Sequence, residues 1–425
     1  MKGSRASRSR SAGVVSFSAV LAYFIAVAER SSLGVAALDA SNRFGISAAQ
    51  LSSLTVFQLI VYAAMQIPVG VLLDRFGSRR LLVVGGLLMA SGQMLVASTN
   101  TFEVAVAGRA LLGIGDAFTF ISMIRLIDNW YKGSAATRRT QLFANIGQLG
   151  QVFSAIPFAA FLHASGWANA FYLLAALAVL GAICTLLLVR DSRQGNRALP
   201  ASSTAELIGN LRQNLRDPAV RLAFWTHFTT QFSGSVFVLL WGYTFLTSAQ
   251  QLPAEVASGL IASFVAIGFA AGPVFSAICA NRPHWRSRVV ITTAGAVVAL
   301  WSVVLAWSGP APLWVIVLLI LVIGSGGPAS MMAFDFTRKL VPPHRLGSAN
   351  GVANIGGFLA TFVTMFLVGL LLDFALRSGW TDGLYSLDGF RLALPIQFAV
   401  IAVGVIGFLV ERKKAKSRYG NNAGL

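Results

Sequence analysis

Three ionisable residues stand inside apolar stretches of this sequence. Glu29 and Arg30 are adjacent within the run FIAVAERSSLGVAA, and Asp116 lies alone within GIGDAFTF. An arginine guanidinium can hold a carboxylate, nitrate or phosphate through two parallel hydrogen bonds. A carboxyl group kept away from water can take up and release a proton near neutral pH. These residue types therefore predict anion binding and proton movement.

The elements that carry these residues are set by the composition. Of the 425 residues, 56% are hydrophobic and 11% are charged, whereas a soluble domain has about 25% charged residues. Many apolar runs reach the roughly 20 residues that span a bilayer as a helix, and they lack the alternation of barrel strands. We expect an all-α polytopic membrane protein with twelve transmembrane helices. The predicted spans are 14–38, 51–73, 80–99, 103–127, 140–162, 167–189, 220–248, 257–280, 289–307, 312–336, 347–373 and 390–411.

The formal charge of +18 is distributed by side of the membrane. Basic clusters fall in every second loop and at both ends, at 2–10, 75–80, 132–139, 282–288, 338–345 and 412–416. By the positive-inside rule both termini are cytoplasmic, and the charge gives no reason to expect nucleic acid as a partner. We expect a multi-pass protein of the plasma membrane, here a bacterial inner membrane. A cleavable signal ending at Ala28 is the alternative, but the apolar run continues past that point.

The chain divides near its middle at a polar segment. We predict a six-helix bundle over 1–189, a cytoplasmic linker over 190–219, a second six-helix bundle over 220–411 and a basic tail over 412–425. The tetrapeptide ANIG opens the fifth span of each half, at 144–147 and 353–356. Matching positions indicate duplication, so the halves are predicted to be pseudo-symmetric with a site near the midplane.

A motif between the second and third spans identifies a family. The run GVLLDRFGSRR closely resembles the signature loop of the major facilitator superfamily. Its motif residues are Gly70, Asp74, Arg75, Gly77, Arg79 and Arg80. Arg109, which opens RALLG in the fourth span, extends the resemblance. It implies the major facilitator fold and a gating role for the loop, with Asp74 facing the start of the eleventh span. The second-half counterpart, 281–288, lacks the aspartate.

A narrower resemblance concerns the charged residues. The segment ERSSLGVA, beginning at Glu29, is similar to the acid-arginine motif in the first span of the anion:cation symporters. The segment around Asp116 resembles their fourth span, where a glutamate takes the place of the aspartate. The resemblance implies that Arg30 binds an organic anion and that Glu29 and Asp116 are proton sites. The alternative is architectural: a buried pair of Arg30 with Asp116, or of Glu29 with Arg109, holding the first and fourth spans together.

Polar residues at helical spacing are further candidates for the cavity wall. Such groups either contact substrate or join helices. The candidates are Tyr23, Tyr62, Gln66, Asn145, Gln148, His227, Gln231 and Asn354. Arg125 and Asp128, three residues apart near the end of the fourth span, are expected to form a gate or a snorkelling pair.

These features predict a secondary active transporter that takes up a small organic anion with protons by alternating access. An efflux antiporter for drugs or metabolites is the alternative, although the fifth span lacks the GxxxGPxxGG-like run of drug antiporters. A membrane enzyme or sensor is a remote third, because no nucleophile–base set or metal motif is present in the sequence. We expect no cofactor or metal, and a monomer whose partners are its substrate, protons and the bilayer.

Overall fold

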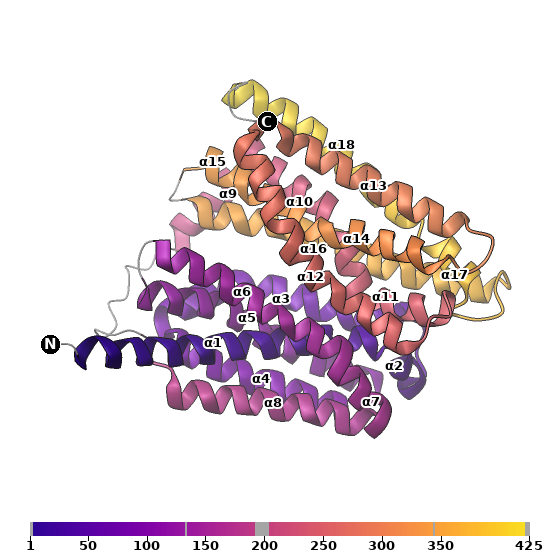
Figure 1. Ribbon diagram of the computed structural model, residues 1–425, viewed down its shortest axis with the longest axis horizontal. Coiled ribbons are helices and arrows are strands. Elements are labelled where there is room, and N and C mark those ends of the chain that lie inside the picture. The colour runs from indigo at the N-terminus through magenta and orange to yellow at the C-terminus, as the bar shows by residue number, and fades with distance from the viewer. Residues whose placement is uncertain (1–2, 132–133, 192–203, 343–344, 421–425) are drawn as a thin grey trace. The chain divides into compact units, whose positions relative to one another are not determined.

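The computed structural model describes residues 3–131, 134–191, 204–342 and 345–420 (Figure 1). Within these ranges the chain forms helices and connecting turns, without a β-strand. Eleven helices of the described residues are long and apolar enough to cross a membrane. The prediction of an all-α polytopic membrane protein is therefore confirmed.

The predicted span at 140–162 is helical, although it is not among those eleven. It runs through α6 (Ser134–Phe153), a π-helical turn η1 (Ser154–Phe158) and α7 (Ala159–Ser165). The π turn contains Pro157, which cannot donate a backbone hydrogen bond. Asn145, Gln148 and Gln151 lower the hydropathy of this helix. The same polar residues are the candidates for the cavity wall on this helix.

Contacts divide the chain into two compact units. The first comprises Met1–Ile46 and Ser53–Ala201. Its remaining helices are α1 (Gly3–Val35), α2 (Ala37–Phe44), α3 (Ala48–Phe76), α4 (Ser78–Ser98), α5 (Phe102–Trp130) and α8 (Trp167–Leu188). Helix α4 packs closely on α5 and α8, and α1 packs on α5, α6 and α8. The small residues Gly92 and Gly108 face each other's backbone carbonyls, which lets α4 and α5 approach closely.

The second unit comprises Ser47–Ser52 and Ser202–Leu425. Its elements are α9 (Thr204–Arg216), α10 (Pro218–Val236), η2 (Phe237–Trp241), α11 (Gly242–Thr244), η3 (Phe245–Ala249), α12 (Ala254–Asn281), η4 (Pro283–Trp285), α13 (Arg286–Ala306), α14 (Leu313–Ser330), α15 (Met332–Leu340), α16 (Leu346–Arg377), α17 (Leu387–Ala393) and α18 (Ile396–Tyr419). Helix α10 is central and contacts α13, α14, α15, α16 and α18.

The ANIG repeats occupy equivalent places in the two units. Gly147 of α6 has no room for a side chain because the Tyr23 ring of α1 lies against it. Gly356 of α16 likewise has no room for a side chain, here because the Phe224 carbonyl of α10 lies against it. Since α1 and α10 carry the first predicted span of each half, the same pair of helices meets through the same motif twice. This packing is what a duplicated sequence would produce.

Helix α9 of the central polar segment is docked on the second unit. The buried Asn214 donates to the Arg345 carbonyl at 3.0 Å and to the Ser348 hydroxyl at 2.7 Å. Asp217 caps α10 through the Ala219 amide and also accepts from the Tyr419 hydroxyl at 2.7 Å. These bonds tie the end of α9 to α10, α16 and α18. Residues 192–203 of the predicted linker lie outside the described ranges.

Candidate functional site

The first unit joins Arg30 of α1 to Asp116 of α5. Arg30 Nε donates to Asp116 Oδ2, and Arg30 Nη2 donates to Asp116 Oδ1, both at 2.7 Å. Asp116 is fully buried, and the Arg30 side chain retains 15% exposure. The two short, parallel bonds are the geometry in which a guanidinium binds any carboxylate. One of the two ion pairs left open by the sequence is therefore formed.

Aromatic and amide side chains surround this pair. The Arg30 guanidinium carbon lies 4.8 Å from the Tyr62 ring centroid, within the range of a cation–π contact. Tyr23 lies within electrostatic range of both Arg30 and Asp116. The Tyr23 hydroxyl accepts a hydrogen bond of 2.9 Å from Gln148 Nε2 of α6. The structure therefore brings Tyr23, Tyr62 and Gln148 together around Arg30.

Two other candidates, Gln66 and Asn145, lie on α3 and α6. Gln66 Nε2 donates to the Tyr62 carbonyl at 3.4 Å, a local bond within α3. Asn145 is exposed on α6, three residues before Gln148. Substrate contact by Gln66 and by Asn145 stays a prediction.

A second polar group lies behind the ion pair. Glu29 of α1, Gln93 of α4 and Arg109 of α5 are fully buried. Among the described residues, their side-chain nitrogen and oxygen atoms make no hydrogen bond of full geometry, although Gln93 lies close enough to Glu29 to interact with it. Glu29 and Arg109 attract each other electrostatically, and each also senses Asp116. The second predicted pair is thus close but not hydrogen-bonded, and buried charges left in this way are costly unless they serve a purpose.

Sequence reasoning did not single out two polar residues, the buried Gln93 and the half-buried Asp191. Gln93 is a polar residue in the apolar third span, and that exception was the available signal. In the structure it is buried in the same cluster as Glu29 and Arg109. Asp191 lies three residues after the end of α8 and is the acid that meets the signature loop. Its position at the basic end of the unit was the available signal.

The signature loop is organised around that aspartate. Gly77 adopts φ 78° between α3 and α4, a conformation that favours glycine. Asp191 Oδ1 accepts from the Arg79 amide at 2.8 Å, at the N-terminus of α4. Asn129 and Trp130 of α5 hold the carbonyls of Asp191 and Arg190 at 3.0 and 2.9 Å. The loop is therefore clamped by the ends of α5 and α8.

The other gating candidates are placed around this clamp. Arg75 lies over the Phe76 ring at 5.2 Å, and Arg80 is exposed. Gly70 is half-buried in α3, and the Asp74 side chain lies outside the described atoms. Near the end of α5, Arg125 is half-buried and Asp128 is exposed. A gating role for these residues stays a prediction.

The second unit carries a separate polar cluster. His227 Nδ1 faces the Ser330 carbonyl of α14 at 3.4 Å, and the Ser330 hydroxyl donates to Gln231 Oε1 at 3.0 Å. Asn354 of α16 lies close enough to interact with His227. Gly357 of α16 gives these side chains room, because a Cβ there would clash with His227 and Gln231. The three predicted residues of this half are thus neighbours.

The fold is that of a helical membrane protein, and sequence comparison assigns its family. A model of the Major Facilitator Superfamily matches residues 19–365. The chain belongs to this superfamily, and it is a transporter rather than an enzyme.

Individual relatives and structures agree with this placement. The chain is 23% identical over 411 residues to a probable L-galactonate transporter of Escherichia coli strain K12, covering 92% of this chain and 86% of the relative. It is 33% identical over 150 residues to the multidrug efflux pump LfrA of Mycolicibacterium smegmatis, covering 35% of this chain and 29% of the pump. A crystal structure of a bacterial homolog of the human lysosomal transporter Spinster has the same fold, with a TM-score of 0.74 at 15% identity over 95% of this chain and 97% of that one.

Proposed function

We propose that this transporter carries a small organic anion together with protons, with Arg30 as the anion anchor. The observation that supports this most is the bidentate bond between Arg30 and Asp116. The two Arg30 donors that would bind a substrate carboxylate now bind the carboxylate of Asp116. The full-length similarity to a probable L-galactonate transporter is consistent with an anionic substrate.

The geometry offers a simple coupling rule. A substrate carboxylate and an ionised Asp116 would compete for one guanidinium and repel each other. Protonation of Asp116 removes that competition, because a neutral carboxyl group no longer pairs with Arg30 as an anion does. A proton on Asp116 and an anion on Arg30 would then travel together. Release of both restores the internal ion pair.

Glu29 is proposed as the second proton site. It is buried beside Gln93 and Arg109, and its electrostatic coupling to Asp116 lets the charge of one carboxyl group affect the other. A proton on either acid therefore changes the electrostatic interactions of Arg30 and Arg109 with the two carboxyl groups. We propose symport directed inward across a bacterial inner membrane, by alternating access and by a monomer.

Efflux of drugs or metabolites is the second candidate, favoured by the local similarity to LfrA. Many drug substrates are lipophilic cations, for which a buried Arg30 is an unfavourable neighbour. The two functions differ in the charge of the substrate and in the direction of the proton.

The test is transport by the purified protein in proteoliposomes. Labelled L-galactonate, other sugar acids, short carboxylates and a lipophilic cation would each be supplied with and without an imposed pH gradient. We expect accumulation of at least one anion in the alkaline compartment and none of the cation. Accumulation of the cation in the acidic compartment, with no anion moved, would replace symport by efflux antiport.

A further inference from the structure

One end of the second unit carries an aromatic ring between two arginines. The turn between α12 and α13 places Trp285 4.8 Å from the Arg282 guanidinium carbon and 5.7 Å from that of Arg288. Both arginines are exposed, and Trp285 is half-buried. Trp and Arg together are characteristic of the membrane–water interface, where the indole lies at headgroup depth.

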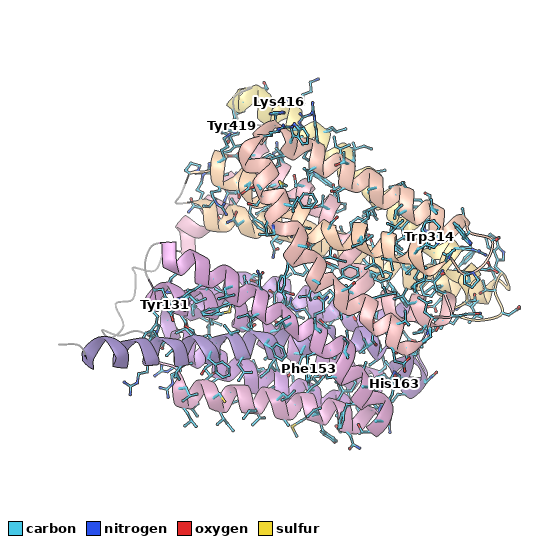
Figure 2. All side chains as sticks on the ribbon, in the orientation of Figure 1. Tyr131, Phe153, His163, Trp314, Lys416 and Tyr419 are labelled. Atoms are coloured by element: carbon cyan, nitrogen blue, oxygen red, sulfur yellow. The ribbon has the colours of Figure 1, made fainter. Side chains whose placement is uncertain are left out.

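The end of α18 adds more positive charge beside this turn. Val289 and Val290 of α13 share an apolar cluster with Ala415 of α18, so the two helices meet at their basic ends. Lys413 is exposed and Lys416 is half-buried on the same end of α18. Figure 2 shows Lys416 beside Tyr419 at that end of the helix. We call Arg282, Trp285, Arg288, Lys413 and Lys416 the basic surface.

Neighbouring acids do not neutralise the basic surface. The sequence has no Asp or Glu between Glu255 and Asp335, and none after Glu411. Glu411 is buried and already receives Arg221 at 2.9 Å and Lys414 at 2.8 Å. Asp335 pairs with Arg338. The charge of the basic surface is therefore available to an external anion.

An apolar groove lies along α12, the helix that ends just before Arg282. It has a volume of about 520 Å³ and is lined by α12 and α14, including Ala270, Val274 and Leu321. Val274 precedes Arg282 by eight residues, which is about 12 Å at ~1.5 Å per helical residue. A ligand with a phosphate at Arg282 and an alkyl chain of ordinary length would reach this groove.

We propose that the basic surface binds the phosphate of an anionic phospholipid, with one acyl chain in the groove between α12 and α14. The arginine fork matches phosphate oxygens, and lysines add long-range attraction. On the predicted topology this end faces the cytoplasm, where anionic headgroups give the membrane a negative surface. Segment 281–288, the counterpart of the signature loop that lacks its aspartate, would thus bind a lipid phosphate. This inference does not depend on which substrate is transported.

The experiment is native mass spectrometry of the full-length protein. The purified protein is mixed with a defined lipid in detergent and is released from the detergent in the spectrometer. Phosphatidylglycerol and phosphatidylcholine of equal chain length would be titrated separately. We expect wild type to retain phosphatidylglycerol preferentially, and Arg282→Gln with Arg288→Gln to weaken its retention at least tenfold. The matched control removes two exposed arginines elsewhere on the unit, Arg212→Gln with Arg377→Gln, and should retain the lipid as wild type does.

Two further measurements distinguish lipid binding from binding of the headgroup alone and from an effect on folding. Trp285→Leu keeps every charge, and we expect it to weaken retention while the thermal unfolding midpoint stays unchanged. Glycerol phosphate, which lacks acyl chains, should fail to displace bound phosphatidylglycerol at equal concentration. Equal retention by the Arg282/Arg288 double variant, or displacement by glycerol phosphate, would show that no specific phospholipid site exists here.

Discussion

At the scale of the residue, the central feature is a guanidinium that already binds a carboxylate. The sequence predicted Arg30, Glu29 and Asp116 as the charged set from their place in apolar runs. Adjacent residues lie about 100° apart on a helix, so Glu29 was not expected to satisfy Arg30, but the sequence could not decide between an anion-binding role and a buried pair of Arg30 with Asp116 or of Glu29 with Arg109. The structure assigns Asp116 to the pair and leaves Glu29 with Gln93 and Arg109.

Arg30→Lys tests the fork of the guanidinium separately from its charge. A lysine keeps the positive charge but offers a compact ammonium instead of two parallel donors. Loss of one charge-assisted bond costs about 1.5–3 kcal/mol, so we expect substrate affinity to fall roughly 10- to 100-fold. Scintillation proximity binding on the purified protein measures it, once a transported anion is found. Arg30→Gln should bind more weakly still, and unchanged affinity in both variants would exclude Arg30 as the anchor.

Asp116→Asn tests the coupling rule. The amide keeps nearly the same shape but cannot take up a proton, so the anion should no longer be driven by the pH gradient. We expect gradient-driven accumulation to fall at least tenfold while exchange of labelled for unlabelled anion persists. Glu29→Gln provides the comparison for the second acid. Normal concentrative uptake by Asp116→Asn would remove this residue from the proton path.

At the scale of the element, the signature loop shows what a motif can and cannot predict. The motif GVLLDRFGSRR places Gly77 in the turn between α3 and α4, where the backbone has φ 78°, a conformation that favours glycine. The partner of the loop, Asp191, lies beyond the end of α8 and has no fixed spacing to the motif. Likewise, the π turn at Pro157 and the docking of α9 through Asn214 depend on neighbours that no local pattern contains.

Asp191→Ala tests the clamp on the signature loop. Removing the carboxylate leaves the Arg79 amide without its acceptor at the start of α4, which costs about 1 kcal/mol for a lost helix cap. We expect faster amide hydrogen exchange across 77–81 with little change elsewhere in α4. Asp128→Ala is the control, because that carboxylate is exposed at the same end of the unit. Equal exchange in the two variants would show that Asp191 does not hold the loop.

At the scale of the whole molecule, two units of similar helix packing repeat one plan. Composition and the length of the apolar runs were enough to predict the membrane class, because few soluble folds tolerate so little charge. The ANIG repeat predicted the duplication, and its glycines pack against α1 at the Tyr23 ring and against α10 at the Phe224 carbonyl. The side chains that line each unit could be predicted only as candidates, because a polar residue in a membrane helix serves substrate or packing equally well.

The repeated packing predicts equal sensitivity in the two units. Gly150→Val in α6 and Gly356→Val in α16 each drive a side chain into the backbone of the facing helix, at Phe24 and Phe224. Overpacking of this kind costs about 1–3 kcal/mol, so both should lower the thermal unfolding midpoint in detergent. Gly351→Val in α16 meets open space and should leave the midpoint near that of wild type. A neutral Gly356→Val would argue against the equivalence of the α6–α1 and α16–α10 contacts.

The central claim is that an anion and a proton cross together, and proton flux tests it most directly. Proteoliposomes containing a pH-sensitive dye and no initial pH gradient would receive an inward gradient of a transported anion. The account predicts that the lumen acidifies as the anion enters, and that Asp116→Asn abolishes the acidification. Alkalinisation of the lumen, or anion entry without any pH change in the wild type, would contradict symport.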